Sequence, residues 1–380
     1  KSMNELIYNV KIDGTEFQVQ KNYHTMLNNR VKERDLAKKN WGVIDSIKEL
    51  KEGYLSQVVH EIILLMMRYN SIIVMEDLNP NFKHSRISID SQIYQKFEKA
   101  LIDKLGYLVL KRDEVVDGEI IEKGNVLNGF QLACPIPAIK DMKNQNGFIF
   151  YVWPQYTSKI DPISGFVSMF DTSEKNIDGY IEFFKKFSAI KYNGQDFEFH
   201  IDDYQLFFDK KNKMPLNKFV LTSKGTKWIN VNNNGKWESI PTEPTKDLLK
   251  LFENRIDING DIRAQITENK MSSEFYYDLT HIFKNVVQLR NSKIGDDSVD
   301  YILSPYLLED GTTFNSLDIQ EQVQNGKNVM LPIDADANGA YHIALKGLMA
   351  LETITEDGKI KISNKNTDWF EFIQKKKYRN

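Results

Sequence analysis

Two groups of acidic residues stand where carboxylates could bind metal ions, and Glu76 is the first. It directly follows Ser71–Met75, a short apolar run that predicts a strand buried on both faces of a sheet. Hydrolysis of a phosphodiester by two divalent ions needs carboxylates at such rigid strand ends. A strand that ends in an acid for solubility alone explains the same pattern, so Glu76 is a candidate.

The second group is Asp334, Asp336 and Asn338, at alternate positions before a helix predicted to reach about Leu351. Asp and Asn are good N-cap residues, which gives a purely structural explanation. A calcium-binding EF-hand loop is excluded, because its twelfth position would be Leu345 where a bidentate Glu is needed. A metal-binding carboxylate that opens the helix is the third interpretation. On the residues alone, the cap and the metal ligand both stay open.

Strands and helices are predicted to alternate around Glu76. Residues 3–20 indicate a hairpin with Asp13-Gly14 as its turn, and we expect Gly53 to break the chain. A helix after Gly53 is predicted from apolar residues at helical spacing: Leu55, Val58, Val59, Ile62, Ile63, Met66 and Tyr69. A helix over about 91–105 and a strand over 107–111 follow. This alternation indicates an α/β layer.

The composition changes beyond about residue 147. Residues 148–330 are richer in aromatics, Asn, Asp and Gly, and they predict an inserted α+β domain. Its predicted strands are 148–152 and 219–222, and its predicted helices are 246–253 and 273–289. From residue 331 the α/β pattern returns and ends in a final helix. We therefore divide the chain into 1–147, 148–330 and 331–380.

The bulk composition excludes several classes of protein. Of 380 residues, 41% are hydrophobic and 27% charged, as in globular proteins, and no apolar run reaches the roughly 20 residues of a membrane helix. The single cysteine, Cys134, excludes an internal disulfide and a cysteine-cluster zinc site, and favours the cytoplasm. The net charge of −3 means that nucleic-acid binding would have to rest on local basic patches.

Five motifs in order resemble the type V-A CRISPR effectors, the Cas-twelve-a or Cpf-one family. They are Gly53–His60, Val74–Asn79, Gln288–Ser292, Tyr301–Pro305 and Asp334–His342. The resemblance also covers Lys96–Leu105, Tyr156–Phe166 and the end of the chain. It implies an α/β, RNase H-like (RuvC) domain that is interrupted by an inserted α+β Nuc domain. The implied activity is Mg²⁺-dependent, guide-RNA-directed cleavage of DNA in a prokaryotic cytoplasm, with Mn²⁺ as a second candidate metal.

Four catalytic residues are implied by this resemblance. Glu76 matches the catalytic Glu of the second RuvC motif, and Asp336, not Asp334, matches the catalytic Asp of the third. These two carboxylates are the implied metal ligands. Arg290 and Asp300 match the active-site arginine and aspartate of the Nuc domain. A guanidinium suits that role because it can hold a phosphate with two hydrogen bonds without losing its proton.

Two basic stretches are candidates for contacts with guide RNA or target DNA. Residues 24–41 resemble the bridge helix of the family, and the stretch 82–86 resembles its lid. The candidate contacts are Arg30, Arg34, Lys38, Lys39, Trp41, Lys83 and Arg86. Basic side chains hold the phosphate backbone without reading its sequence. A solvated charged surface is the alternative for each of them.

The sequence departs from the family pattern in two places. The first RuvC motif, a strand with a catalytic Asp, is not found, and Asp13 stands too near Tyr23 to replace it. We expect the N-terminal remainder of the same protein to supply it. At the positions of Asn315 and Leu317, members of the family that the sequence resembles carry Asp and Arg. The loss of these two charges puts the geometry and the substrate affinity of the implied Nuc domain in question. A non-catalytic nucleic-acid-binding fragment, a split chain that needs a partner and a structural protein are the alternatives.

Overall fold

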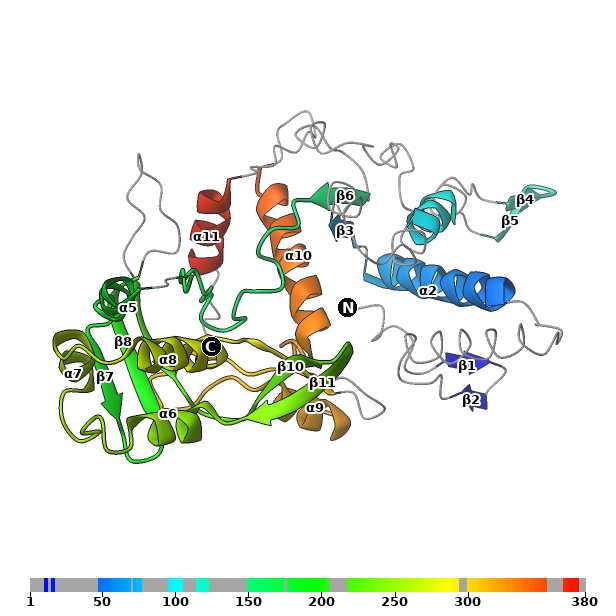
Figure 1. Ribbon diagram of the computed structural model, residues 1–380. Coiled ribbons are helices and arrows are strands. Elements are labelled where there is room, and N and C mark those ends of the chain that lie inside the picture. Colours follow the sequence, from blue (N-terminus) through cyan, green and yellow to red (C-terminus); the bar gives the residue numbers. More distant parts are fainter. Residues whose placement is uncertain are drawn as a thin grey trace, which may run out of the picture. The chain divides into compact units, whose positions relative to one another are not determined.

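The chain forms two compact units, each built from segments that are distant in sequence (Figure 1). The computed structural model describes residues 10–12, 15–17, 47–69, 71–76, 95–104, 114–122, 149–173, 176–204, 217–293, 299–353 and 365–375. Unit 1 comprises residues 1–155 and 343–364; unit 2 comprises residues 156–342 and 365–380. The expected domain boundaries, after 147 and 330, precede these unit boundaries. The assignment of the units to RuvC and Nuc stays a prediction.

A parallel pair of strands in unit 1 ends in Glu76. Strand β3 (Ile73–Glu76) pairs with β6 (Ile149–Val152), and Glu76 lies opposite Val152. Parallel neighbours need a long crossover between them, which fits the predicted α/β layer. Among the described residues of β3 only Met75 is buried, and the others are half-buried. The expectation of a strand buried on both faces was therefore too strong.

Helix α2 (Ile47–Tyr69) runs without interruption through Gly53. The expected break at Gly53 is wrong. A glycine inside a helix costs only about 1 kcal/mol relative to alanine. The buried face of α2, with Leu55, Val58 and Val59, offsets that cost by packing into the core of unit 1. Tyr69, expected on the same face, is exposed.

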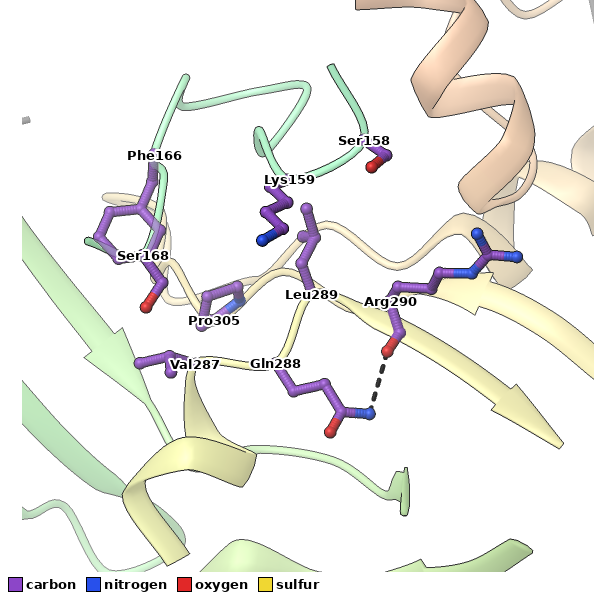
Figure 2. Close-up of a pocket in the computed structure, with 9 residues that line it drawn as sticks. All are labelled: Ser158, Lys159, Phe166, Ser168, Val287, Gln288, Leu289, Arg290 and Pro305. Atoms are coloured by element: carbon purple, nitrogen blue, oxygen red, sulfur yellow. Dashed lines mark hydrogen bonds between the residues drawn. The ribbon is translucent and has the colours of Figure 1, made fainter. Parts of the chain in front are cut away.

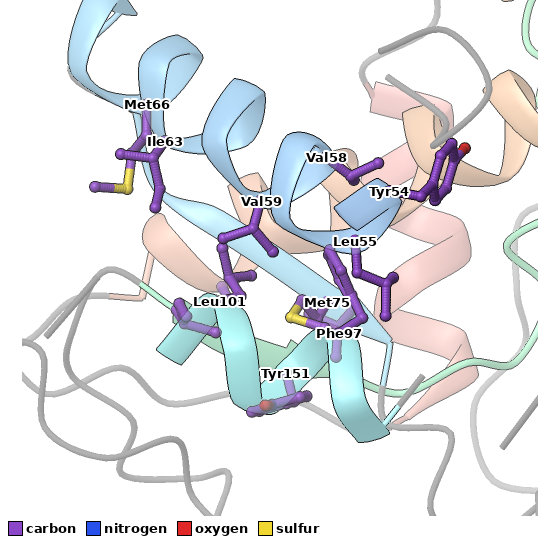
Figure 3. Close-up of a cluster of buried hydrophobic side chains, with 13 residues drawn as sticks. Tyr54, Leu55, Val58, Val59, Ile63, Met66, Met75, Phe97, Leu101 and Tyr151 are labelled. Carbon is purple, nitrogen blue, oxygen red and sulfur yellow. The ribbon is translucent and has the colours of Figure 1, made fainter. Parts of the chain in front are cut away.

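The core of unit 1 joins α2, β3, β6 and a helix over residues 95–104 (Figure 3). Its buried members are Tyr54, Leu55, Val58, Val59, Ile63, Met66, Met75, Phe97, Leu101, Ile149, Tyr151, Val152 and Ala350. Burial of each large apolar side chain contributes roughly 1.5–3 kcal/mol. The hydroxyl of Tyr151 donates a hydrogen bond to Glu98, which ties β6 to the helix over 95–104.

Two short hairpins also belong to unit 1. Strands β1 (Val10–Ile12) and β2 (Thr15–Phe17) pair antiparallel, which confirms the predicted hairpin. Strands β4 (Glu114–Val116) and β5 (Glu119–Glu122) are joined by Asp117 and Gly118. Both turn residues have positive φ, 54° and 85°, as a type I′ turn requires.

Unit 2 is built around a three-stranded antiparallel sheet and an aromatic core. The sheet order is β7 (Ala189–Tyr192), β8 (Phe197–Tyr204), β9 (Asn217–Thr222). Its helices are α5 (Ile177–Phe184), α6 (Pro244–Phe252), α7 (Ile262–Glu268) and α8 (Ser273–Val286). Edge-to-face contacts join Phe183, Phe187 and Phe199 to Phe283 of α8. The predicted strand at 219–222 and the helices at 246–253 and 273–289 are confirmed.

Two hairpins and three helices complete the described chain. The hairpins are β10 (Lys227–Asn233) with β11 (Lys236–Thr242), and β12 (Arg290–Lys293) with β13 (Val299–Ile302). The helices are α9 (Ser316–Gln324), α10 (Ala335–Leu351) and α11 (Asn366–Lys375). The predicted helix to Leu351 and the final helix are confirmed. No helix in the described ranges is both long enough and apolar enough to cross a membrane.

The second half of α10 packs very closely on β3 at Gly347. A Cβ atom added at Gly347 would lie 2.3 Å from Cγ2 of Val74, inside any normal contact distance. Val74 is β-branched and cannot turn aside freely. Since Val74 precedes Glu76 by two residues, this contact helps to fix the end of the strand that carries the acid.

Gly347→Ala is therefore expected to destabilise the protein by roughly 1–3 kcal/mol, the usual effect of overpacking. Gly53→Ala is the matched control, because nothing lies within 4 Å of an added Cβ there. It should raise the free energy of unfolding by about 0.5–1 kcal/mol. Urea denaturation of both variants tests the difference, and equal stabilisation by the two would contradict a close contact at Gly347.

Candidate functional site

Hairpin β12–β13 brings Arg290 and Asp300 together. Nη2 of Arg290 donates to Oδ2 of Asp300 at 3.0 Å, so the two residues that the resemblance singled out in this region are in contact. Ser292 lies directly opposite Asp300 in the strand register. Its hydroxyl donates to Oδ1 of Asp300 at 3.1 Å and accepts from Nε of Arg290 at 3.3 Å. Sequence reasoning missed Ser292, although strand alternation places residues 290 and 292 on one face.

The start of helix α10 supplies two further carboxylates. Oδ1 of Asp334 accepts a hydrogen bond from the backbone N–H of Ala337 at 2.6 Å, so the N-cap interpretation is confirmed for Asp334. Asp336 stands in the first turn of the helix, and its Oδ1 lies 3.3 Å from Nη1 of Arg290. The two acids of this motif therefore have different contacts, and Asp336 is the one that pairs with the arginine.

The carboxylates of Asp300, Asp334 and Asp336 form a negatively charged cluster around the guanidinium of Arg290. Burial raises the pKa of Asp300 to about 6; the charge of Arg290 lowers it, and the charge of Asp336 raises it further. Burial also raises the pKa of Asp334, while its bond from the N–H of Ala337 lowers it. Three carboxylates therefore face one positive charge. Such a cluster attracts cations more strongly than isolated acids do.

A buried lysine holds the base of the hairpin. Nζ of Lys227 donates to the carbonyl of Gln288 at 2.7 Å and to that of Leu303 at 3.0 Å. The side chain is completely buried, and this burial lowers the pKa of Lys227 to about 7 against the opposing effect of Asp161. Because Gln288 precedes β12 and Leu303 follows β13, Lys227 fixes both ends of the hairpin. Sequence reasoning missed this residue as well.

A pocket of about 270 Å³ opens beside Arg290 (Figure 2). Figure 2 shows the ammonium of Lys159 ending among the lining residues, near Leu289 and Pro305. The side-chain amide of Gln288 donates to the carbonyl of Arg290 at 3.0 Å and keeps that backbone in place. Lys159 is exposed and belongs to the motif Tyr156–Phe166. Two cationic residues, Lys159 and Arg290, thus line the same pocket.

Glu76 belongs to unit 1 and is accompanied there by a buried lysine. Nζ of Lys346, in the second half of α10, donates to the carbonyls of Trp153 and Gln155, both at 2.5 Å. Burial lowers the pKa of Lys346 to about 8, and the nearby charge of Glu76 opposes that change. Lys346 was not predicted. Asp336 belongs to unit 2, so the predicted sharing of a metal cluster by Glu76 and Asp336 stays a prediction.

The family model for the RuvC nuclease domain matches residues 1–378. The chain belongs to this family. Membership gives the chain a nuclease function and agrees with its mixed helices and strands. It also places the acidic residues at strand β3 and helix α10 in a nuclease rather than in an unrelated α/β protein.

RuvC nucleases typically use divalent metals, and the oxygen donors present here are of the right kind. Carboxylates are the ligands that Mg²⁺ prefers, and the side chain of Asp336 is 47% exposed. Within the described part of the chain, no three acidic, histidine or cysteine side chains lie close enough together to hold an ion by themselves. The assignment of Glu76 and Asp336 as metal ligands stays a prediction.

The predicted nucleic-acid contacts lie outside the residues that the structure describes. They are Arg30, Arg34, Lys38, Lys39, Trp41, Lys83 and Arg86. The predicted bridge helix over 24–41, the strand at 107–111 and Asp13 also lie outside them. For this RuvC nuclease, these assignments remain predictions.

Lys227→Met is expected to lower the free energy of unfolding by roughly 1–3 kcal/mol, because two buried carbonyls lose their donor. The difference in the free energy of unfolding between the wild type and Lys227→Met should increase with pH. Between the folded pKa of about 7 and the unfolded value of 10.5, the unfolded chain holds a proton that the folded chain has released. The stability of the wild type therefore rises with pH in this window. Urea denaturation at pH 7 and pH 9 compares the two proteins, and a pH-independent difference would contradict the assigned pKa.

Proposed function

We propose that this RuvC nuclease is the catalytic portion of a CRISPR RNA-guided endonuclease that cleaves DNA with divalent metal ions. The observation that carries the proposal is the position of Arg290, which contacts Asp300 on one side and Asp336 on the other. Guide RNA and target DNA are the proposed partners, and the prokaryotic cytoplasm is the proposed compartment. Base pairing between guide and target would choose the sequence, and the protein would supply backbone contacts and the cut.

The hydrogen bonds of Arg290 leave it able to bind a phosphate. A guanidinium has five N–H donors. The contacts of Arg290 use three of these donors: one N–H on Nη2, one N–H on Nη1 and the N–H of Nε. The remaining donors, one on each terminal nitrogen, can bind a phosphate oxygen pair while Asp300 and Ser292 hold the side chain. Since the Arg290 side chain is 48% exposed, a DNA strand can approach it from solvent.

The ion pairs of Arg290 contribute little to stability. Pairs that are this exposed are worth about 0–1 kcal/mol, because water screens the charges. The arrangement is therefore better explained by the ligand that it can hold. Asp300 would act as a positioning residue, and Arg290 as the group that neutralises charge on the scissile phosphate.

Glu76 and Asp336 are the proposed metal ligands. Bound Mg²⁺ or Mn²⁺ would supply activation of water and neutralisation of the leaving oxygen. The protein itself would position the carboxylates of Glu76 and Asp336 and orient the DNA strand. Lys346 stands near Glu76 and keeps positive charge beside it. Lys159 and Arg290 would hold the phosphates of the strand that enters the pocket.

Arg290→Ala should lower DNA cleavage by roughly 100-fold or more, because a donor aimed at the reacting phosphate is lost. Binding of guide RNA and target DNA should change by only a few-fold. The measurements are single-turnover cleavage and filter binding by the protein that carries this chain, assembled with guide RNA. Arg255→Ala is the matched control, since Arg255 is an exposed arginine outside the cluster. Equal losses in binding and cleavage would assign Arg290 to general affinity or folding.

Asp336→Asn and Glu76→Gln should each abolish cleavage or raise the Mg²⁺ concentration that it requires by at least about tenfold, because each removes a charged ligand. The test measures the cleavage rate as a function of Mg²⁺ concentration, with a sample in EDTA as the metal-free reference. Asp334→Asn is the control, because an amide oxygen can still cap helix α10. Full activity of Glu76→Gln and Asp336→Asn would refute the proposed metal ligands.

A further inference from the structure

The start of strand β10 is bonded to hairpin β12–β13 at several points. The carbonyl of Thr226 accepts a hydrogen bond from the hydroxyl of Tyr301 at 2.8 Å. The backbone N–H of Trp228 donates to Oδ1 of Asn291 at 3.2 Å. Between these two residues, Lys227 donates to the carbonyls that flank the hairpin on both sides. Three consecutive residues therefore hold the hairpin at its two ends and within both of its strands.

These bonds lead to the backbone of Arg290. The carbonyl of Gln288 accepts from Nζ of Lys227 at 2.7 Å, and the side-chain amide of Gln288 donates to the carbonyl of Arg290 at 3.0 Å (Figure 2). The same amide donates to the carbonyl of Trp228 at 2.8 Å. The next residue in the strand, Asn291, is fully buried. The backbone of Arg290 is therefore held from both sides, while its side chain stays half-exposed.

Lys227 is a charged group in a place that is unfavourable for charge. Its side chain is completely buried, and this burial lowers the pKa of Lys227 to about 7. The desolvation of a buried charge offsets much of what its hydrogen bonds contribute. An ammonium nevertheless has three N–H donors on one atom, so Lys227 holds the carbonyls of Gln288 and Leu303 at a fixed separation. The main consequence of this side chain is the geometry of the two hairpin ends.

A buried carboxylate, Asp161, provides the opposite charge. Asp161 is 1% exposed, and its charge raises the pKa of Lys227. Its Oδ1 accepts from the backbone N–H of Ser164 at 2.6 Å, whereas its Oδ2 has no hydrogen-bond partner within the described ranges. Asp161 belongs to the same loop as Lys159, which lines the pocket beside Arg290. Each of the two segments that bring a cation to this pocket is therefore held by one of two buried, opposite charges.

We propose that Lys227 is a positioning residue for the cleavage of a phosphodiester. It holds the two ends of hairpin β12–β13 so that the guanidinium of Arg290 stands where the scissile phosphate binds. Lys227 itself does not touch the DNA strand, because it is completely buried. The inference rests on the proposed function, since it concerns the role of Arg290. A displacement of about 1 Å at a reacting group can slow a reaction by about 100-fold.

Lys227→Met removes both hydrogen bonds and keeps an unbranched side chain. Single-turnover cleavage is measured on the full protein assembled with guide RNA, as a function of protein concentration. The rate at saturation should fall roughly 10- to 100-fold, because Arg290 is displaced. The concentration that gives half of this rate should change by less than about twofold, because Lys227 does not contact the strand. An unchanged rate at saturation in the folded variant would overturn the proposal.

A double variant separates positioning from a general effect on the protein. If Lys227 acts through Arg290, adding Lys227→Met to Arg290→Ala should slow cleavage by less than about twofold further. Two independent effects would instead multiply. A loss in the double variant equal to the product of the two single losses would therefore contradict a path through Arg290.

Tyr276→Phe is the matched control for the loss of a buried donor. Tyr276 is fully buried, and its hydroxyl donates to the carbonyls of Ile266 at 2.7 Å and of Asn269 at 3.2 Å. None of these residues belongs to β10 or to hairpin β12–β13. The variant should lose stability, measured by urea denaturation, but keep the cleavage rate within about twofold of the wild type. A rate that falls as far as in Lys227→Met would assign both losses to destabilisation and overturn the positioning role.

Gln288→Met is a second variant that perturbs folding less, since Gln288 is only half-buried. It removes the donor to the carbonyl of Arg290 while Lys227 stays in place. The cleavage rate at saturation should fall roughly tenfold, because the backbone of Arg290 loses one of its supports. If Lys227→Met does not fold, a wild-type rate in Gln288→Met overturns the proposal by itself.

The outcomes distinguish this inference from the proposed function. If Arg290→Ala cleaves slowly while Lys227→Met and Gln288→Met cleave at the wild-type rate, the positioning role fails and the proposed function stands. If Arg290→Ala cleaves at the wild-type rate, the proposed role of Arg290 fails, and the inference fails with it. Slow cleavage by all three variants, with no further loss in the double variant, supports both.

Discussion

Carboxylates that repel one another have to be held close together, and in unit 2 the hairpin β12–β13 and the start of helix α10 do this. Asp300, Asp334 and Asp336 all lie within electrostatic range of one another, and each raises the pKa of a neighbour or has its own raised. Arg290 reduces the repulsion, but one positive charge does not cancel three negative ones. The remaining negative charge favours cations near the cluster.

The cluster is held in place by buried bonds behind it rather than by its own ion pairs. Its ion pairs are half-exposed and contribute at most about 1 kcal/mol each. Lys227, by contrast, is completely buried and donates to carbonyls at both ends of the β12–β13 hairpin. Asn291 is also fully buried, and its Oδ1 accepts from the N–H of Trp228. The rigid polar layer fixes the backbone, and the exposed side chains remain free to exchange partners.

Local patterns in the sequence predicted the elements that carry the site. The apolar run before Glu76 and the acids before residue 335 correctly indicated a strand end and a helix start. The resemblance singled out Arg290 and Asp300, and their contact came from the structure. Lys227 and Lys346 could not be found in this way, because their partners are 61 to 193 positions away in the chain. Gly53 was misread because the packing of α2 outweighs the low helix propensity of one glycine.

The departure from the family pattern at Asn315 can be interpreted from its contacts. Asn315 is the N-cap of α9, and its Oδ1 accepts from the backbone N–H of Leu317 at 3.1 Å, as an aspartate would. The next residue, Ser316, is buried and accepts from the N–H of Ile302, which ties α9 to the strand that carries Asp300. Compared with the type V-A effectors that the sequence resembles, Asn315 would keep the geometry of the helix start without the negative charge of an aspartate. Leu317 would stand in place of the arginine of that pattern.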